Sequence, residues 1–349
     1  MVKANAYGHG IKQIVPLAEE AGIDHFSVFS VYEAREVRQA AHRKSDIMIM
    51  GWVASRDLKW VIQNGIEFFV FDLTFLRRAL EEARKLGQPI KIHVEVETGL
   101  YRTGFDLEHL PVVMQIIRQY SRHIQVKGIC THFAGSESIA NHVRVNHQFK
   151  KFNRIVQRFR DRGIEAEYLH TACSAATLNY PRTQLDLVRI GIMQYGYWPG
   201  AETRIRYLHR RELKEDPLQR VITWKSQVMS VKKVPVGEYI SYGNSYLAQE
   251  DKVIAVVPVG YAMGYRRSLS NYGIVLIHGQ RANVIGLVNM NMLTIDVTLL
   301  PEVNRGDEVI LIGRSGDLEI SVSSFAEMSN MLNYESLTRI PAEIKRKVV

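Results

Sequence analysis

The sequence has little that could cross-link the chain or hold it in a membrane. Its 349 residues include 2 cysteines, Cys130 and Cys173, too few for a disulfide framework, and this scarcity favours a reducing compartment. No apolar run approaches the ~20 residues of a membrane-spanning helix, so no membrane partner is expected. Repeats and low-complexity segments are also missing, and 46% hydrophobic and 23% charged residues exclude a disordered or collagen-like chain. The sequence therefore predicts a globular protein of roughly two domains.

Positive charge exceeds negative charge, with 45 Lys and Arg against 36 Asp and Glu and a net charge of +9. The excess gathers in residues 204–220 and 339–347. Neither stretch interleaves aromatic side chains with its charges, as a base-stacking surface would. Solvated loops and a charged chain end account for the excess, so nucleic acid is not the expected partner. A nucleic-acid binder would instead show steeply salt-dependent binding.

Short β-branched or aromatic runs alternate with helical patterns through the first part of the chain. Apolar side chains recur at helical spacing from Ile11 to Ala18, and Gly22 could end that helix. Strict alternation of strand and helix predicts a parallel sheet. Long, almost continuously apolar strands favour a closed (β/α)8 barrel of the TIM type. The predicted strands are residues 25–30, 46–51, 67–72, 91–98, 125–133, 168–173 and 185–191.

The barrel is one strand short at its beginning. Residues 1–3 look like the end of a truncated first strand, so we expect the natural protein to begin upstream, and an export signal could be lost with that part. After Arg220, short strands separated by turn residues predict an antiparallel unit. The predicted fold is therefore α/β, with a (β/α)8 barrel over residues 1–218 and a mostly antiparallel β domain over residues 219–349.

In such a barrel the carboxyl ends of the strands form the active face. Lys3 would end the first strand, where a partly desolvated lysine can form a Schiff base with a carbonyl. Ser174 and the backbone N–H groups near Gly191 and Ile192 could hold a phosphate. Arg189 could keep a ring nitrogen unprotonated, because a guanidinium does not release its proton. Each residue alone has an ordinary structural explanation, and only their arrangement around one barrel mouth favours a catalytic site.

Residues 2–10 (VKANAYGHG) resemble the pyridoxal-phosphate lysine motif of alanine racemases, which is highly specific. The resemblance covers the whole chain and continues in sequence order. The further matching segments are residues 97–104 (ETGLYRTG), 131–133 (THF), 173–176 (CSAA), 188–192 (VRIGI), 241–243 (SYG), 260–262 (GYA), 290 (M) and 333–335 (NYE). By these matches the chain is identified as a member of the alanine racemase family.

The resemblance implies a pyridoxal-phosphate-dependent enzyme that interconverts L- and D-alanine. Lys3 would bind the cofactor and exchange a proton on one face of the substrate Cα, and Tyr242 of the partner subunit would serve the other face. A homodimer with shared active sites is therefore expected, and D-alanine for a bacterial cell wall would place it in the cytoplasm. The other implied roles are cofactor binding by Tyr7, His132, Ser174, Arg189, Gly191, Ile192 and Tyr334, and substrate binding by Arg102, Met290 and Tyr261. His132 would link Arg189 to Tyr242, and no metal is implied.

Several positions depart from the family pattern. Glu95 stands where many members have a lysine, often carbamylated, and its carboxylate could replace the carbamate in orienting Arg102. The alternative is that Glu95 is a strand residue of no special role. Residues 287–291 (LVNMN) and Met263 replace charged residues near the substrate entrance. A racemase of serine or of larger, basic amino acids therefore stays an alternative, as does an inactive truncated paralogue.

Overall fold

The computed structural model describes residues 1–212, 215–328 and 333–349, and these form two compact units. Unit 1 comprises Met1–Ala6 and Ile11–Arg220, and unit 2 comprises Tyr7–Gly10 and Val221–Val349. The chain therefore contributes a short early segment to unit 2 before it builds most of unit 1. Sequence order assigns that segment to the first domain, and the contacts described below explain why it packs with the second.

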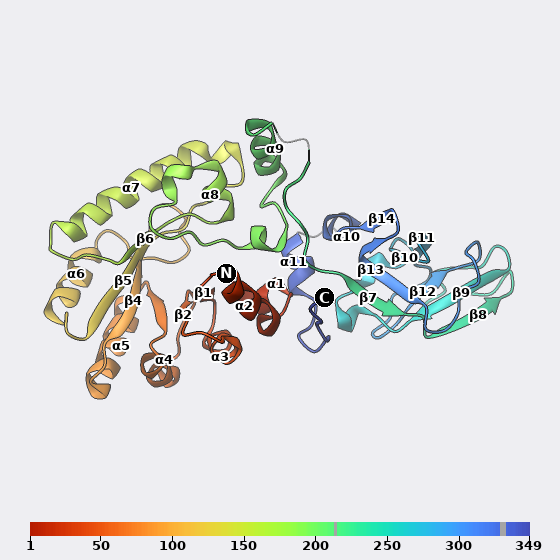
Figure 1. The fold of residues 1–349 in the computed structure, drawn as a ribbon, viewed down its shortest axis with the longest axis horizontal. Helices are drawn as coiled ribbons and strands as arrows, with labels where there is room; N and C mark the ends of the chain where they lie inside the picture. The colour runs from red at the N-terminus through yellow and green to blue at the C-terminus, as the bar shows by residue number, and fades with distance from the viewer. Residues whose placement is uncertain (213–214, 329–332) are drawn as a thin grey trace. The chain divides into compact units, whose positions relative to one another are not determined.

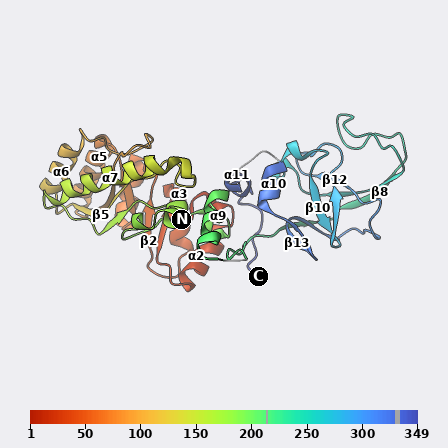
Figure 2. The same cartoon turned by 90° about the horizontal axis from the view of Figure 1, so that it is seen from above.

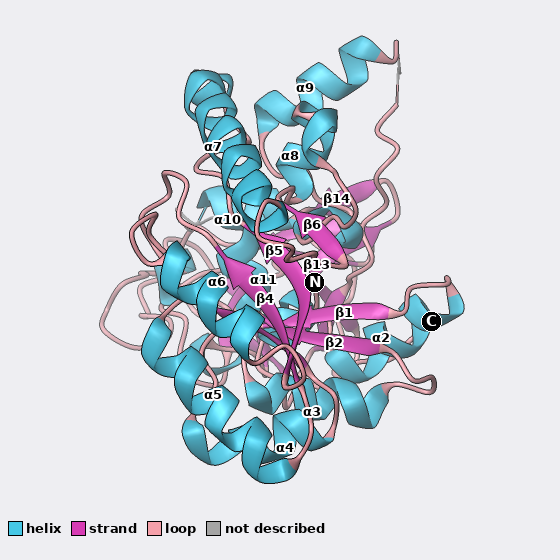
Figure 3. Cartoon of the chain, turned by 90° about the vertical axis from the view of Figure 1, so that its left-hand side faces the viewer, coloured by secondary structure: helices cyan, strands magenta, loops and turns pink. Residues whose placement is uncertain are grey.

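Unit 1 is built on a parallel sheet with helices around it (Figure 3). In the described part of the chain, six strands pair in sequence order. They are β1 (His25–Val28), β2 (Asp46–Ile49), β3 (Glu67–Val70), β4 (Ile90–Glu95), β5 (Ile124–Cys130) and β6 (Tyr168–His170). The helices are α2 (Ile11–Glu20), α3 (Val31–Ala40), α4 (Leu58–Gln63), α5 (Leu73–Leu86), α6 (Leu110–Gln119), α7 (His142–Arg160), α8 (Ser174–Asn179) and α9 (Ala201–Arg210). Every residue of β3 is buried, as expected for a parallel strand covered on both faces.

Local sequence determines where several of these helices begin and end. The Glu33 backbone N–H donates to Ser30 Oγ at 3.3 Å, and Glu33 Oε2 accepts the Ser30 N–H at 3.1 Å. This reciprocal capping box starts α3. Helix α5 starts where Asp72 Oδ1 accepts a backbone N–H from Phe75 at 2.7 Å, and it ends at Gly87 with φ +64°. These are short-range effects that depend only on neighbouring residues.

The predicted α/β unit with a following antiparallel β unit is confirmed, but one predicted strand is wrong. Residues 185–191 form no strand, and this part of the described chain pairs through an isolated parallel bridge between Cys173 and Arg189. The reason is the side chain of Asp186, whose Oδ2 accepts the Leu169 N–H of β6 at 2.8 Å. A side chain therefore takes the donor that a neighbouring strand would have used.

The first two residues lie beside β1. The Val2 N–H donates to Ser27 O at 2.9 Å, and Met1 O accepts the Tyr195 hydroxyl at 2.9 Å. Val2 is 1% exposed. These contacts fix the backbone immediately before Lys3.

The described part of unit 2 consists of antiparallel sheets and short helices (Figures 1 and 2). Within its described residues, one sheet has the order β11-β10-β13-β14 with β7 also paired to β13, and another has the order β12-β9-β8. The strands are β7 (Trp224–Gln227), β8 (Ser230–Val234), β9 (Lys252–Val257), β10 (Ile274–Ile277), β11 (Gln280–Asn283), β12 (Leu293–Asp296), β13 (Glu308–Ser315) and β14 (Leu318–Ile320), and the helices are α10 (Val322–Met328) and α11 (Asn333–Thr338). His278 and Gly279, with φ +49° and +72°, join β10 to β11, as expected for a tight hairpin turn.

Candidate active site

Lys3 begins a left-handed turn, labelled α1 (Lys3–Tyr7). The residues that follow it, 4–7, have φ between 52° and 53°. Left-handed backbone costs roughly 1–2 kcal/mol for each residue other than glycine. None of these residues is glycine, and strain of this kind is concentrated at functional sites. The turn determines the direction in which the chain leaves Lys3.

Polar contacts within unit 1 hold this turn in place. Glu33 Oε1 accepts the Ala4 N–H at 2.6 Å, while Oε2 of the same carboxylate accepts the Phe29 N–H at 2.8 Å. On the far side of the turn, Asn5 Oδ1 accepts the Ile11 N–H at 2.9 Å and so caps the start of α2. The carboxylate of Glu33 therefore joins the turn after Lys3 to the start of α3. Glu33 is not part of any motif that marks the site, although its place in the capping box is visible in the sequence.

Lys3 lies in a basic environment. Burial lowers the pKa of the Lys3 amine, the charges of Arg102 and Arg189 lower it further, and Glu33 opposes them. A larger fraction of the amine is therefore neutral near physiological pH, which makes it a better nucleophile and base. Glu95 is 5% exposed, and burial raises the pKa of its carboxyl against the opposing effects of Thr103 and the two arginines.

Arg189 is 7% exposed and is held mainly by backbone oxygens. Its NH2 group donates to Thr131 O at 2.7 Å and to Thr171 O at 3.2 Å, and it lies 3.5 Å from His132 Nδ1. Burial lowers the pKa of His132 to about 3, assisted by nearby cations of which Arg189 is the first. His132 is therefore neutral, and its Nδ1 can accept from Arg189, as sequence analysis expected for the first half of the predicted link.

Ser174 and the 191–192 segment meet at the end of the sheet. The bridge between Cys173 and Arg189 aligns the two chain segments, and the Gly191 N–H donates to Ser174 Oγ at 2.8 Å. Ser174 is 5% exposed and Ile192 is fully buried. A hydroxyl and neighbouring backbone amides thus lie together, which is the arrangement that holds phosphate groups.

In unit 2, Tyr7 lies beside Tyr334, with ring centroids 6.1 Å apart. The contact depends on Gly8, which has φ +81° and lies so close to α11 that a Cβ would be 2.0 Å from Leu337 O. Arg346 Nε and NH2 donate to Gly8 O at 3.0 and 2.8 Å. These contacts explain why the segment after Lys3 packs with unit 2.

The other predicted residues of unit 2 gather on adjoining loops. Tyr242 is 74% exposed, on a turn where Ser241 and Gly243 have φ +68° and +73°. Ser241 accepts a hydrogen bond from Asn289 at 3.3 Å, next to Met290 in the chain. The Tyr261 N–H donates to Asn289 O at 3.0 Å. Tyr242, Tyr261 and Met290 therefore belong to one loop cluster.

The structure also reveals buried polar residues that sequence analysis missed. Glu67, His93 and His170 are fully buried within β3, β4 and β6, and they connect to Arg189 by hydrogen bonds that are described below. A signal was present in the sequence, because Glu67 and His93 each belong to a predicted strand and lie between two apolar residues, and His170 follows Leu169. Their meeting could not be read from it, because they come from separate strands.

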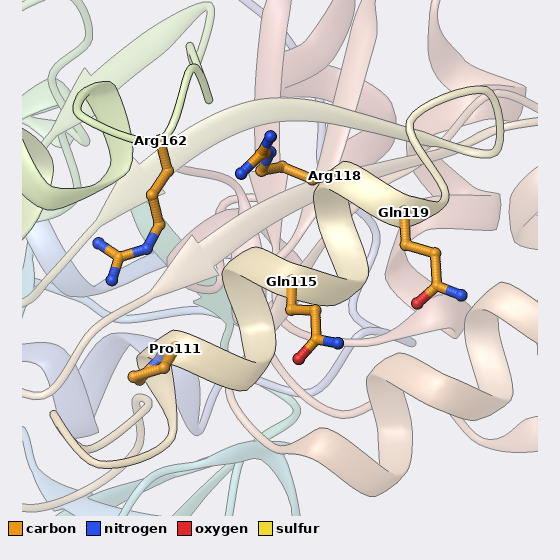
Figure 4. Close-up of a pocket in the computed structure, with 5 residues that line it drawn as sticks. All are labelled: Pro111, Gln115, Arg118, Gln119 and Arg162. Atoms are coloured by element: carbon orange, nitrogen blue, oxygen red, sulfur yellow. The ribbon is translucent and has the colours of Figure 1, made fainter.

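A surface pocket outside the sheet does not contain any of the predicted site residues. It is lined by Pro111, Gln115, Arg118, Gln119 and Arg162 (Figure 4). Four of these residues lie on α6, and Arg162 lies just after α7. After Gln119 the chain enters β5, and after Arg162 it enters β6, in each case at the amino end of the strand. This pocket is therefore associated with the opposite end of the sheet from Lys3. In the described ranges no group of His, Cys, Asp or Glu could hold a metal, and no helix is long and apolar enough to cross a membrane.

Comparison with known proteins assigns both parts of the chain. The family model "Alanine racemase, N-terminal domain" matches residues 1–199, and "Alanine racemase, C-terminal domain" matches residues 221–348. An alanine racemase of Clostridium perfringens is 36% identical over 348 residues, covering 99% of this chain and 87% of the relative. One from Leptospira interrogans is 34% identical over 352 residues, covering 100% of this chain and 88% of the relative.

Solved structures agree with this assignment. An alanine racemase from Streptomyces lavendulae, a producer of D-cycloserine, has a TM-score of 0.88 at 29% identity, covering 98% of this chain and 88% of that one. The alanine racemase of Bacillus anthracis with bound L-Ala-P has a TM-score of 0.86 at 31% identity, covering 97% and 85%. The chain belongs to the alanine racemase family, as its sequence motifs predicted, and is accordingly an isomerase.

Proposed function

We propose that this protein is a pyridoxal-phosphate-dependent racemase that interconverts L- and D-alanine. The observation that supports this most directly is the lysine of lowered pKa at a strained turn, influenced by Arg102 and Arg189. Such a donor set suits an anionic cofactor that carries an aldehyde, together with an amino acid that carries a carboxylate.

The residues of the site fit pyridoxal phosphate. Lys3 would supply the amine that binds its aldehyde, and Arg189 would donate to its ring nitrogen. Ser174 and the amides of Gly191 and Ile192 would hold the phosphate, together with Tyr7 and Tyr334. When bound, pyridoxal phosphate draws electrons from the substrate Cα and so makes the Cα proton removable. Arg189 stays protonated throughout, because a guanidinium does not give up its proton.

Two proton-transferring side chains are needed to invert a carbon centre efficiently. Lys3, whose lowered pKa increases its neutral fraction, exchanges the proton on one face of Cα. Tyr242 exchanges it on the other face. Arg102 binds the substrate carboxylate together with the Met290 backbone, and Tyr261 lines the entrance.

We also propose that the active form is a homodimer in which Tyr242 of the partner subunit completes each site. The 74% exposure of the Tyr242 side chain supports this, because a catalytic phenol requires a surrounding that excludes water. A mixture of Lys3→Ala and Tyr242→Phe chains should recover about a quarter of wild-type activity, since half of the dimers would hold one intact site. Recovery no greater than that of the separate variants would contradict a shared site. We place the enzyme in the cytoplasm, as expected for the supply of D-alanine to a cell wall; cell fractionation checks this.

The decisive experiment is a chiral assay with pyridoxal phosphate and separate samples of L-alanine, L-serine and L-lysine. D-Alanine as the main product would support the proposed function. D-Serine or D-lysine as the main product would retain the racemase and move the specificity to residues 289–291 at the entrance. No D-product from any substrate, also in a chain extended at its amino terminus, would refute the racemase.

Lys3→Ala provides the matching control for the cofactor. Borohydride reduction followed by peptide mass spectrometry should attach pyridoxal phosphate to Lys3 in the wild type. The Lys3→Ala variant should carry no such adduct. An adduct on another lysine in the wild type would refute the assignment of Lys3.

A further inference from the structure

A row of buried polar groups crosses the interior of unit 1 and ends at Arg189. His93 Nε2 lies 2.8 Å from Glu67 Oε2, and His93 Nδ1 lies 2.9 Å from His170 Nε2. The other ring nitrogen of His170, Nδ1, is hydrogen-bonded to Arg189 NH1. Glu67, His93 and His170 are each 0% exposed, so solvent does not compete for these bonds.

The chemistry of the end groups fixes the direction of every bond in this row. A guanidinium only donates, so His170 Nδ1 accepts and His170 carries its proton on Nε2. That proton is donated to His93 Nδ1, so His93 carries its own proton on Nε2 and donates it to Glu67. Protonation of either ring would set two N–H groups against each other. Both imidazoles are therefore neutral and share one tautomer.

The electrostatics agree with this hydrogen-bond pattern. Burial lowers the pKa of His170 and of His93; Arg189 adds to the effect at His170, and Glu67 opposes it at His93. Burial alone would raise the pKa of the Glu67 carboxyl, but His25 and His93 hold it well below its usual value. Glu67 is therefore ionised, and the row joins a buried cation to a buried anion through two neutral rings.

Gly128 leaves the space in which His93 and His170 contact each other. It lies on β5, between β4 and β6, and it pairs with His93 on one side. A Cβ at this position would lie 2.2 Å from His93 Nδ1 and 2.8 Å from His170 Nε2. The missing side chain thus allows two rings from non-adjacent strands to meet across β5.

Two further basic side chains lie beside Glu67, at the anionic end of the row. Lys127 Nζ lies 3.5 Å from Glu67 Oε1 and is also hydrogen-bonded to Glu167. His25 Nε2 lies 3.3 Å from Glu67 Oε2. Glu67 consequently has cationic or donor groups on both oxygens, which stabilises its charge without solvent.

We propose that Glu67, His93 and His170 are positioning residues that hold one edge of the Arg189 guanidinium and so determine how Arg189 meets the cofactor ring. This inference rests on the proposed function, because it requires Arg189 to face the cofactor. The described contacts of Arg189 use NH1 and NH2 towards the interior of unit 1. The row fixes which nitrogens are engaged, because a change of tautomer at either ring would replace a hydrogen bond by a repulsive contact.

The first test uses the apoprotein and does not depend on activity. ¹⁵N NMR of labelled imidazoles should show His93 and His170 neutral, protonated on Nε2, and without titration between about pH 5 and 8. In Glu67→Gln, the amide oxygen can still accept from His93 Nε2, so both tautomers should be retained, but the His93 Nε2 resonance should shift because its acceptor has lost its charge. Glu167→Gln is the matched control, because it neutralises a carboxylate bound to the same lysine without touching the imidazole row, and its spectrum should match the wild type.

The second test uses the holoenzyme. Glu67→Gln should reduce kcat on the order of tenfold, the scale of one lost charge-assisted hydrogen bond, with KM within about twofold. Gly128→Ala should act in the same direction, and Glu167→Gln should leave kcat unchanged. Wild-type imidazoles that titrate between pH 5 and 8, or an unchanged kcat or an unchanged His93 Nε2 resonance in Glu67→Gln, would each overturn the inference. A wild type that binds no pyridoxal phosphate would defeat the proposed function and the positioning role together, while the apoprotein tautomers would remain as described.

Discussion

Replacing Glu33 by alanine tests whether the turn after Lys3 is held by a single carboxylate. Glu33 accepts backbone N–H groups from Ala4 at 2.6 Å, Phe29 at 2.8 Å and Ser30 at 3.1 Å. A hydrogen bond to a charged group contributes roughly 1.5–3 kcal/mol, and because Glu33 is half-buried, water replaces part of this loss. We expect Glu33→Ala to destabilise unit 1 by about 2–4 kcal/mol. Loss of the negative charge should also lower the pKa of Lys3 further.

Urea unfolding of the apoprotein measures this change, and amide hydrogen exchange over residues 1–30 locates it. Glu36→Ala is the control, because Glu36 lies on the same helix and its described contact is the Tyr32 hydroxyl at 3.3 Å. Both variants gain the same helix propensity, so the difference between them isolates the three backbone contacts. A Glu33→Ala effect within about 0.5 kcal/mol of the Glu36→Ala effect would refute the reasoning.

Three further predictions follow from single sites. Gly8→Ala should destabilise unit 2 severely in thermal unfolding, because its Cβ would lie 2.0 Å from the Leu337 carbonyl oxygen. Gly237 also has a positive φ, +88°, but no neighbour within 4 Å, so Gly237→Ala should show only the smaller destabilisation caused by backbone strain. Reductive methylation of Lys3 should have a pH midpoint below 10.5, and removing the charge of Arg102 should raise that midpoint. His132 has a pKa of about 3 in the folded state and 6.5 in the unfolded chain. Between these values only the unfolded chain binds a proton at His132, so the stability of the folded state should fall as pH falls from 6.5 towards 3. His132→Phe should flatten that part of the stability profile. Equal effects of the two glycine variants, a Lys3 midpoint at 10.5, or an unchanged profile in His132→Phe would contradict these respective arguments.

Much of unit 1 was predictable because its signals are local. Apolar runs such as residues 67–72 predicted buried strands, and the spacing from Ile11 to Ala18 predicted α2. The strand predicted at residues 185–191 does not form because the Asp186 side chain accepts the Leu169 backbone N–H. One aspartate does not alter the apolar pattern of the segment, so the pattern still predicted a strand.

The site was predictable in part. Motifs identified Lys3, Arg189 and Tyr242 as candidates, and these role assignments stay proposals until the variants are tested. The left-handed turn after Lys3 was not predictable, because alanine and tyrosine normally avoid positive φ. Its conformation depends on partners such as Glu33, which is remote from it in sequence.

The sequence by itself determined most of the order of strands and helices, the family and the residue types of the candidate site, because periodicity and motifs are properties of neighbouring residues. Only the tertiary structure decided that Tyr7–Gly10 packs with unit 2 and that Glu67, His93 and His170 join Arg189. The physical reason is the same in both cases. Such contacts require distant segments to approach closely, which Gly8 and Gly128 permit because they have no side chain. Buried charge is in turn stable only where those segments supply a partner.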